Sequence, residues 1–164
     1  MYLLDTAIVF ELRKAKAGQT DPGLAAWASG IARDQLFLSA ISLLELETRA
    51  ARAQRHDKAS GATLRTWIDS QLLPAFEGHV LPVDLAVVRR RGQLPITATR
   101  DALIAATALE HSLTLVTRDT AAFKGARLRL FNPWGYTPDV EEDTDWRTAG
   151  RTGPLWLKNL FVRA

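Results

Sequence analysis

The chain alternates between short apolar runs and longer stretches in which apolar residues recur at helical spacing. Runs of four or five mostly apolar residues are typical of buried strands, and spacings of three and four are typical of helices that bury one face. Glycine, proline and capping acids mark several of the boundaries, as Asp21 and Pro22 do. The predicted strands are 2–5, 36–39, 79–82, 113–117 and 126–130, and the predicted helices are 6–18, 22–33, 42–56, 61–76, 83–93 and 101–111.

This alternation predicts an α/β fold with three layers, α/β/α, around a central parallel sheet of about four to five strands. Helices 42–56 and 61–76 follow one another without a strand between them, so we expect them to form a protruding helical arm. The 164 residues suffice for one domain, which we assign to residues 1–134. Residues 135–164 lose both periodicities and are interpreted as a C-terminal extension rather than a second domain.

Four acidic residues lie where predicted strands hand over to helices. Strands of a parallel sheet end at one edge, so we expect these carboxylates to converge there. Clustered carboxylates require a countercharge, and an oxygen-only ligand set favours Mg²⁺ or Mn²⁺, which in turn indicates chemistry on phosphate esters. The four acids are Asp5, Glu45, Asp101 and Asp119.

A purely structural interpretation of these acids stays open at this point. Asp5, Asp101 and Asp119 could each cap a helix, which would stabilise it by about 1 kcal/mol. Glu45 is harder to explain in this way because it lies inside a helix, after an apolar run. Glu47 is an alternative for the glutamate role, but its register places it on another face of the helix.

The composition narrows the chemistry and the location. The chain has no cysteine, which excludes thiolate metal sites and thiol nucleophiles, and its three histidines show no ligand spacing. The net charge is +3, with basic clusters along the body and acid concentrated at 139–145, which suits a polyanionic partner unless the clusters are only solvated faces. No uncharged run approaches the roughly 20 residues of a membrane span, and the N-terminus does not resemble a signal peptide. We therefore expect a soluble, cytoplasmic protein with no membrane contact.

Several segments carry a resemblance to a known family. The segments YLLDT, LSAISLLELETR, ITATRDALIAATALEHSLTLVTRDTAAF and LFNPW occur in this order. Together they resemble the PIN-domain ribonucleases, and most of all the VapC-type toxins of bacterial toxin–antitoxin pairs. The resemblance covers nearly all of residues 1–134. It departs from the family pattern at Ala7 and Arg49, which bears on fine substrate positioning and removes no acid.

The resemblance implies roles for particular residues. Asp5, Asp101 and Asp119 would hold one Mg²⁺ or Mn²⁺, while Glu45 would bind a second metal or orient the attacking water. Supporting or phosphate-contacting roles fall to a second group: Thr6, Ser42, Thr117 and Arg118.

The implied function is a metal-dependent endoribonuclease that acts as a toxin and is silenced by a cognate antitoxin. The expected products carry a 5′-phosphate and a 3′-hydroxyl, and the expected oligomer is a homodimer. The alternative is a catalytically inactive PIN fold that binds RNA or protein.

We also expect the acidic, tryptophan-containing extension to lie over the basic surface and fill an apolar groove that an antitoxin segment would otherwise occupy. A phosphatase of the haloacid-dehalogenase type fits less well because Ala7 stands where its second aspartate belongs, and the phosphate-binding motif GxxxxGK[ST] is absent.

Overall fold

The computed structural model describes residues 1–14 and 19–138. Within this part of the chain, five parallel strands form one sheet in the order β3-β2-β1-β4-β5. This confirms the predicted α/β class and the parallel central sheet. The strands are β1 (Tyr2–Leu4), β2 (Leu36–Ser39), β3 (Val80–Leu81), β4 (Thr114–Val116) and β5 (Leu130–Phe131).

The register of the three central strands aligns their ends. Leu4 of β1 lies opposite Leu38 of β2 and Val116 of β4. The residues that follow these positions therefore leave the sheet side by side at its carboxyl edge. Asp5 and Thr117 are two of them, and helix α3 starts directly after β2.

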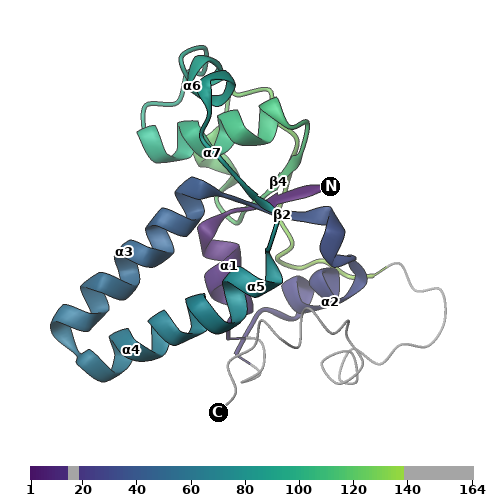
Figure 1. Cartoon of the computed structure of the whole chain (residues 1–164). Coiled ribbons are helices and arrows are strands. Elements are labelled where there is room, and N and C mark those ends of the chain that lie inside the picture. Colours follow the sequence, from purple (N-terminus) through teal and green to yellow (C-terminus); the bar gives the residue numbers. More distant parts are fainter. Residues whose placement is uncertain (15–18, 139–164) are drawn as a thin grey trace.

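Helices cover both faces of the sheet, as the predicted three layers require. Figure 1 shows α6 and α7 on one side, and α1, α2 and α5 on the other. The helices are α1 (Thr6–Leu12), α2 (Pro22–Gly30), α3 (Ala40–His56), α4 (Lys58–Trp67), α5 (Leu73–Ala75), α6 (Leu85–Arg91) and α7 (Thr99–Glu110). Three short turns complete the described elements: η2 (Arg33–Gln35), η3 (Ile68–Leu72) and η4 (Thr120–Phe123).

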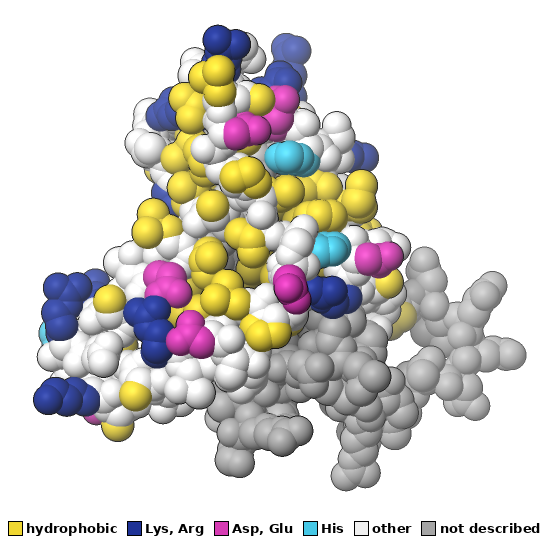
Figure 2. All heavy atoms as spheres, in the orientation of Figure 1, with side chains coloured by type: hydrophobic (Ala, Val, Ile, Leu, Met, Phe, Trp, Pro, Cys, Tyr) yellow, Lys and Arg dark blue, Asp and Glu magenta, His cyan; other side chains and the backbone are white. Residues whose placement is uncertain are grey.

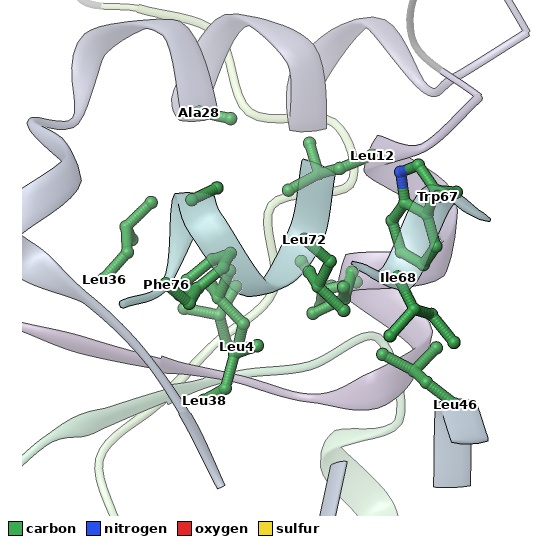
Figure 3. Packing of buried hydrophobic residues seen from close by; sticks show 14 of the residues in the cluster. Leu4, Leu12, Ala28, Leu36, Leu38, Leu46, Trp67, Ile68, Leu72 and Phe76 are labelled. Carbon is green, nitrogen blue, oxygen red and sulfur yellow. The ribbon is translucent and has the colours of Figure 1, made fainter. Parts of the chain in front are cut away.

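The pleat of the sheet divides the core into two. Leu4 and Val116 are fully buried against the helices on the α1 side, in a cluster that includes Trp67 and Phe76 (Figure 3). Their neighbours in sequence, Leu3 and Leu115, are equally buried against α7 on the opposite face. Strands buried on both faces explain why these segments read as continuous apolar runs in the sequence.

Helices α3 and α4 run antiparallel and project from the sheet as the expected arm (Figure 1). Their close approach depends on Gly61, where an added Cβ would lie 2.3 Å from the Cα of Gln54. A side chain at this position would therefore force the two helices apart.

The structure differs from the predicted elements mainly at boundaries. Helix α3 begins at Ala40 instead of Ser42, because the side chain of Ser39 caps it by accepting from the backbone N–H of Ile41. The predicted helix 61–76 extends back to Lys58 and is divided by the wider π-helical turn η3, next to Pro74, which cannot donate a helical hydrogen bond. The last strand covers only Leu130–Phe131, because Arg127 adopts a left-handed backbone with φ of 50° inside the predicted strand 126–130.

The domain boundary at residue 134 stays a prediction. The backbone of Pro133, Gly135 and Tyr136 lies so close to Gly23 of α2 that a Cβ there would approach it within 2.9 Å. The described chain thus packs onto the sheet domain slightly beyond the predicted boundary. The expected tail that covers the basic surface lies outside the described residues. In the described part of the chain, no helix is both long and apolar enough to cross a bilayer.

Candidate active site

Asp5 follows β1 directly and is held at the carboxyl edge of the sheet. Its backbone N–H donates to the carbonyl of Val116 in β4, with an N···O distance of 3.0 Å. The hydroxyl of Thr117 donates to Asp5 Oδ2 at 2.8 Å. The other carboxylate oxygen, Oδ1, is buried and has no hydrogen-bond partner among the described residues, although Asp5 is only 4% exposed.

The surroundings of Asp5 alter its pKa. Burial raises the pKa of Asp5, and the negative charge of Glu45 raises it further. The Thr117 hydrogen bond, the Arg100 charge and the backbone N–H of Thr6 oppose this rise and only partly offset it. The negative charge of this buried carboxylate is only partly compensated by its neighbours, and one of its oxygens has no partner among the described residues. This environment favours a cation at Asp5.

Glu45 reaches the same edge from α3. Its Oε2 accepts a hydrogen bond from the hydroxyl of Thr6, the first residue of α1. Its Oε1 accepts from Arg100 Nη1 at 2.9 Å. The alternative glutamate, Glu47, is ion-paired with Arg65 of α4 and so belongs to the arm. Glu45 and Glu47 thus contact different parts of the fold, as their helical register predicts.

Asp101 lies in the first turn of α7 and is bound by its neighbour Arg100. Arg100 donates to Asp101 Oδ1 from Nε at 2.7 Å, and its Nη2 lies 2.6 Å from the same oxygen. Partial burial by itself would lower the pKa of Arg100, but the hydrogen bonds to Glu45 and Asp101 outweigh it and raise the pKa. The guanidinium thus links two of the predicted acids.

Asp119 stands apart from the other three. Its Oδ1 accepts from the backbone N–H of Ala122 at 3.2 Å and caps the turn η4. It is connected to Asp5 through Thr117, whose hydroxyl also accepts from the backbone N–H of Asp119. The cap interpretation therefore describes the carboxylate of Asp119, whereas the side chain of Asp5 makes no capping hydrogen bond.

The supporting residues divide in a similar way. Thr6 and Thr117 each donate to one of the predicted acids. Ser42 is fully buried in α3, and its hydroxyl has no partner among the described residues. Arg118 is exposed, and its guanidinium carbon lies 5.2 Å from the ring centre of Trp134.

In residues 1–14 and 19–138, no three acidic, histidine or cysteine side chains stand together in an arrangement ready to hold a metal ion. Two contacts hold the predicted acids in other arrangements. Arg100 takes the counter-ion position for Glu45 and Asp101, and Asp119 is turned to its cap. The donor set still fits a hard divalent cation, because every candidate ligand is a carboxylate oxygen and one of them is buried without a partner.

Comparison with known proteins decides the family. The family model described as "PIN domain" matches residues 2–127. The chain belongs to the PIN-domain family. The chain is 34% identical over 142 residues to the protein named Toxin FitB of Neisseria gonorrhoeae, covering 82% of this chain and 99% of that protein. It is 33% identical over 142 residues to the protein named VapC ribonuclease Y4jK of Sinorhizobium fredii, covering 82% of this chain and 98% of that protein.

A solved structure supports the same assignment. The crystal structure of FitAcB from Neisseria gonorrhoeae superposes on this PIN domain with a TM-score of 0.73 at 34% identity, covering 82% of this chain and 99% of that one. The match spans that relative almost from end to end. Nearly a fifth of the present chain therefore has no counterpart in it.

Sequence reasoning missed one residue of the site. Arg100 contacts both Glu45 and Asp101 and also acts on Asp5 through its charge. The available signal was a cation directly before the acid that opens a helix, in the segment TRDALIAA. That signal is weak because an arginine beside an aspartate is usually an exposed pair.

Proposed function

We propose that this PIN domain is a metal-dependent endoribonuclease and the toxin of a toxin–antitoxin pair. The observation that carries the proposal is the carboxylate cluster at the sheet edge, in which a buried oxygen of Asp5 lacks a partner and Glu45 and Asp101 share one counter-ion. A protein that only binds RNA has no use for anions at the place where a phosphate must lie. The relatives named as a toxin and as a VapC ribonuclease support the same activity.

Asp5, Glu45 and Asp101 would hold a Mg²⁺ or Mn²⁺ ion, and Asp119 would join them by turning from its cap. When bound, such an ion makes a water molecule easier to deprotonate and neutralises charge on the phosphoryl oxygens. Thr6 and Thr117 fix the orientation of the Glu45 and Asp5 carboxylates through their hydrogen bonds. Glu45, the more exposed of these two acids, would orient the attacking water or bind a second ion.

Arg118 is the candidate for contact with the RNA backbone. It follows Thr117 at the carboxyl edge, is exposed, and is steadied by the Trp134 ring. A guanidinium at that place can bind a phosphate next to the cleaved bond. Ser42 keeps a proposed supporting role.

The partners follow from the same assignment. We propose a cognate antitoxin that silences the enzyme in the cytoplasm, and a homodimer as the active form. Figure 2 shows hydrophobic side chains gathered on the face between the α3–α4 arm and α6. The exposed large apolar residues of these helices include Leu44 of α3 and Leu85 and Val88 of α6. Exposed apolar surface of this kind is typically covered by a second protein.

Cleavage of purified RNA tests the function. The wild type is incubated with Mg²⁺ or Mn²⁺ and with a chelator, beside Asp101→Asn and a control, Asp84→Asn. Asp84 caps α6 by accepting from the backbone N–H of Val87, a role that asparagine also fills. We expect cleavage by the wild type and the control only with metal, and at least a hundredfold less by Asp101→Asn, since losing charge stabilisation of a transition state typically costs about 10²–10³ in rate. No metal-dependent cleavage by the wild type would leave the inactive binding module as the better description, and equal cleavage by the wild type and Asp101→Asn would remove Asp101 from the active site.

A further inference from the structure

Arg100 is the side chain at the acid cluster that the sequence analysis did not anticipate. Arg100 lies in α7 and contacts Glu45 of α3, which is 55 positions away in the sequence. It also contacts its neighbour Asp101 through Nε and Nη2. One planar group therefore holds two carboxylates that come from α3 and α7.

The guanidinium supplies the positive charge that a bound metal ion would otherwise supply at this place. Glu45 and Asp101 are mostly shielded from solvent, with 21% and 16% of their side-chain surfaces exposed, so their charges need a partner. The charge of Arg100 also acts on the buried Asp5. Three of the four predicted metal ligands thus interact with a single arginine.

Arg100 differs from a structural ion-pair residue in its freedom to leave. Its side chain is 43% exposed, and its hydrogen bonds to Glu45 and Asp101 are exposed as well. A rotation about its own side-chain bonds would release both acids without moving the backbone. A divalent ion that bound Glu45 Oε1 and Asp101 Oδ1 would need the two oxygens that Arg100 holds, so the ion and the guanidinium would compete for them.

We propose that Arg100 is a tethered counter-ion that competes with the divalent metal for Glu45 and Asp101 and thereby weakens metal binding. The proposal rests on the metal site of the proposed function. Arg100 is a positioning residue here: in the metal-free protein it keeps the two carboxylates together, and in the loaded protein it is displaced.

The size of the effect follows from a population argument. If the Arg100 fork is closed about nine-tenths of the time, the apparent dissociation constant of the metal is about ten times the intrinsic one. Removing the side chain should therefore tighten binding by about tenfold. This change in metal affinity can be measured without any assay of RNA cleavage.

The test is titration of the full chain with Mn²⁺, followed by calorimetry and by the paramagnetic resonance signal of the free ion. The variants are Arg100→Ala and Arg100→Lys, and the control is Arg90→Ala. Arg90 is a matched surface arginine, 44% exposed and paired with Glu110 between α6 and α7. We expect Arg100→Ala to bind Mn²⁺ about tenfold more tightly, Arg100→Lys to lie between, since an ammonium lacks the planar fork, and Arg90→Ala to match the wild type.

Melting temperatures provide a second reading. In chelator, Arg100→Ala should melt below the wild type because Glu45 and Asp101 then repel one another, and saturating Mn²⁺ should raise its melting temperature more than that of the wild type. Equal or weaker Mn²⁺ binding by Arg100→Ala would overturn the proposal, as would an Arg100→Lys variant indistinguishable from the wild type. A wild type that binds Mn²⁺ but cuts no RNA would defeat the proposed function alone and leave the competition intact.

Discussion

Replacing Asp5 by asparagine should stabilise the metal-free protein while abolishing its response to metal. In the wild type, Asp5 is 4% exposed, and its Oδ1 has no partner in the described structure. Burial raises the pKa of Asp5, so the native state holds its proton more tightly than the unfolded state does. The ionised side chain therefore costs stability at neutral pH. An amide of the same shape can still accept from Thr117 and carries no charge.

The expected size follows from the cost of an unsatisfied buried polar atom, which is about 1–3 kcal/mol. Because the new amide nitrogen also needs an acceptor, we expect a gain of about 1–2 kcal/mol. For a chain of this length each kcal/mol shifts the melting temperature by about 2–4 °C. The variant should therefore melt about 2–8 °C above the wild type at pH 7 in chelator.

The sign of the pH dependence provides a stricter check. A raised native pKa means that the wild type gains stability as the pH falls through that pKa, because protonation removes the buried charge. The difference between Asp5→Asn and wild type should thus shrink from pH 7 towards acid. Chemical denaturation at several pH values measures it, with Asp84→Asn as the control that should follow the wild type. A variant that is less stable than the wild type at pH 7, or a difference that stays constant with pH, would refute this reasoning.

Three further predictions follow from contacts at the site and in the arm. Thr117→Val removes the donor to Asp5 Oδ2, so it should lower the free energy of unfolding in urea by about 1–3 kcal/mol and weaken Mn²⁺ binding. The control Thr107→Val changes a residue that is also fully buried but bonded within α7, so it should leave Mn²⁺ binding unchanged. Gly61→Ala should cost about 2–3 kcal/mol, since its Cβ would lie 2.3 Å from the Cα of Gln54, whereas Gly30→Ala, with nothing within 4 Å, should change stability by less than about 1 kcal/mol; equal effects would contradict the packing of the arm. Arg118→Ala should raise the KM for RNA and reduce its salt dependence while the melting temperature changes little, and an unchanged KM would remove Arg118 from the phosphate contacts.

The sequence carried most of the fold because its strands are buried on both faces and its helices keep a clear period. Boundaries were missed where a single local interaction decides them. Ser39 caps α3 earlier than expected, and the left-handed backbone at Arg127 shortens the last strand. Neither follows from hydrophobic spacing.

The residue types of the site could be predicted from the sequence, but the contacts between their side chains could not. The rule that parallel strands end at one edge places Asp5 and Thr117 together, and the structure shows their hydrogen bond. The bridge by Arg100 and the cap by Asp119 depend on side-chain rotamers, which a pattern of residue types does not specify. The metal roles of the four acids remain predictions for experiment.

The proposed metal site is tested most directly by an anomalous difference map from crystals of the full chain grown with Mn²⁺. We expect a manganese peak among the carboxylates of Asp5, Glu45 and Asp101, with the guanidinium of Arg100 turned away. A map without a peak at that edge under saturating Mn²⁺, with Arg100 still joining Glu45 to Asp101, would contradict this expectation.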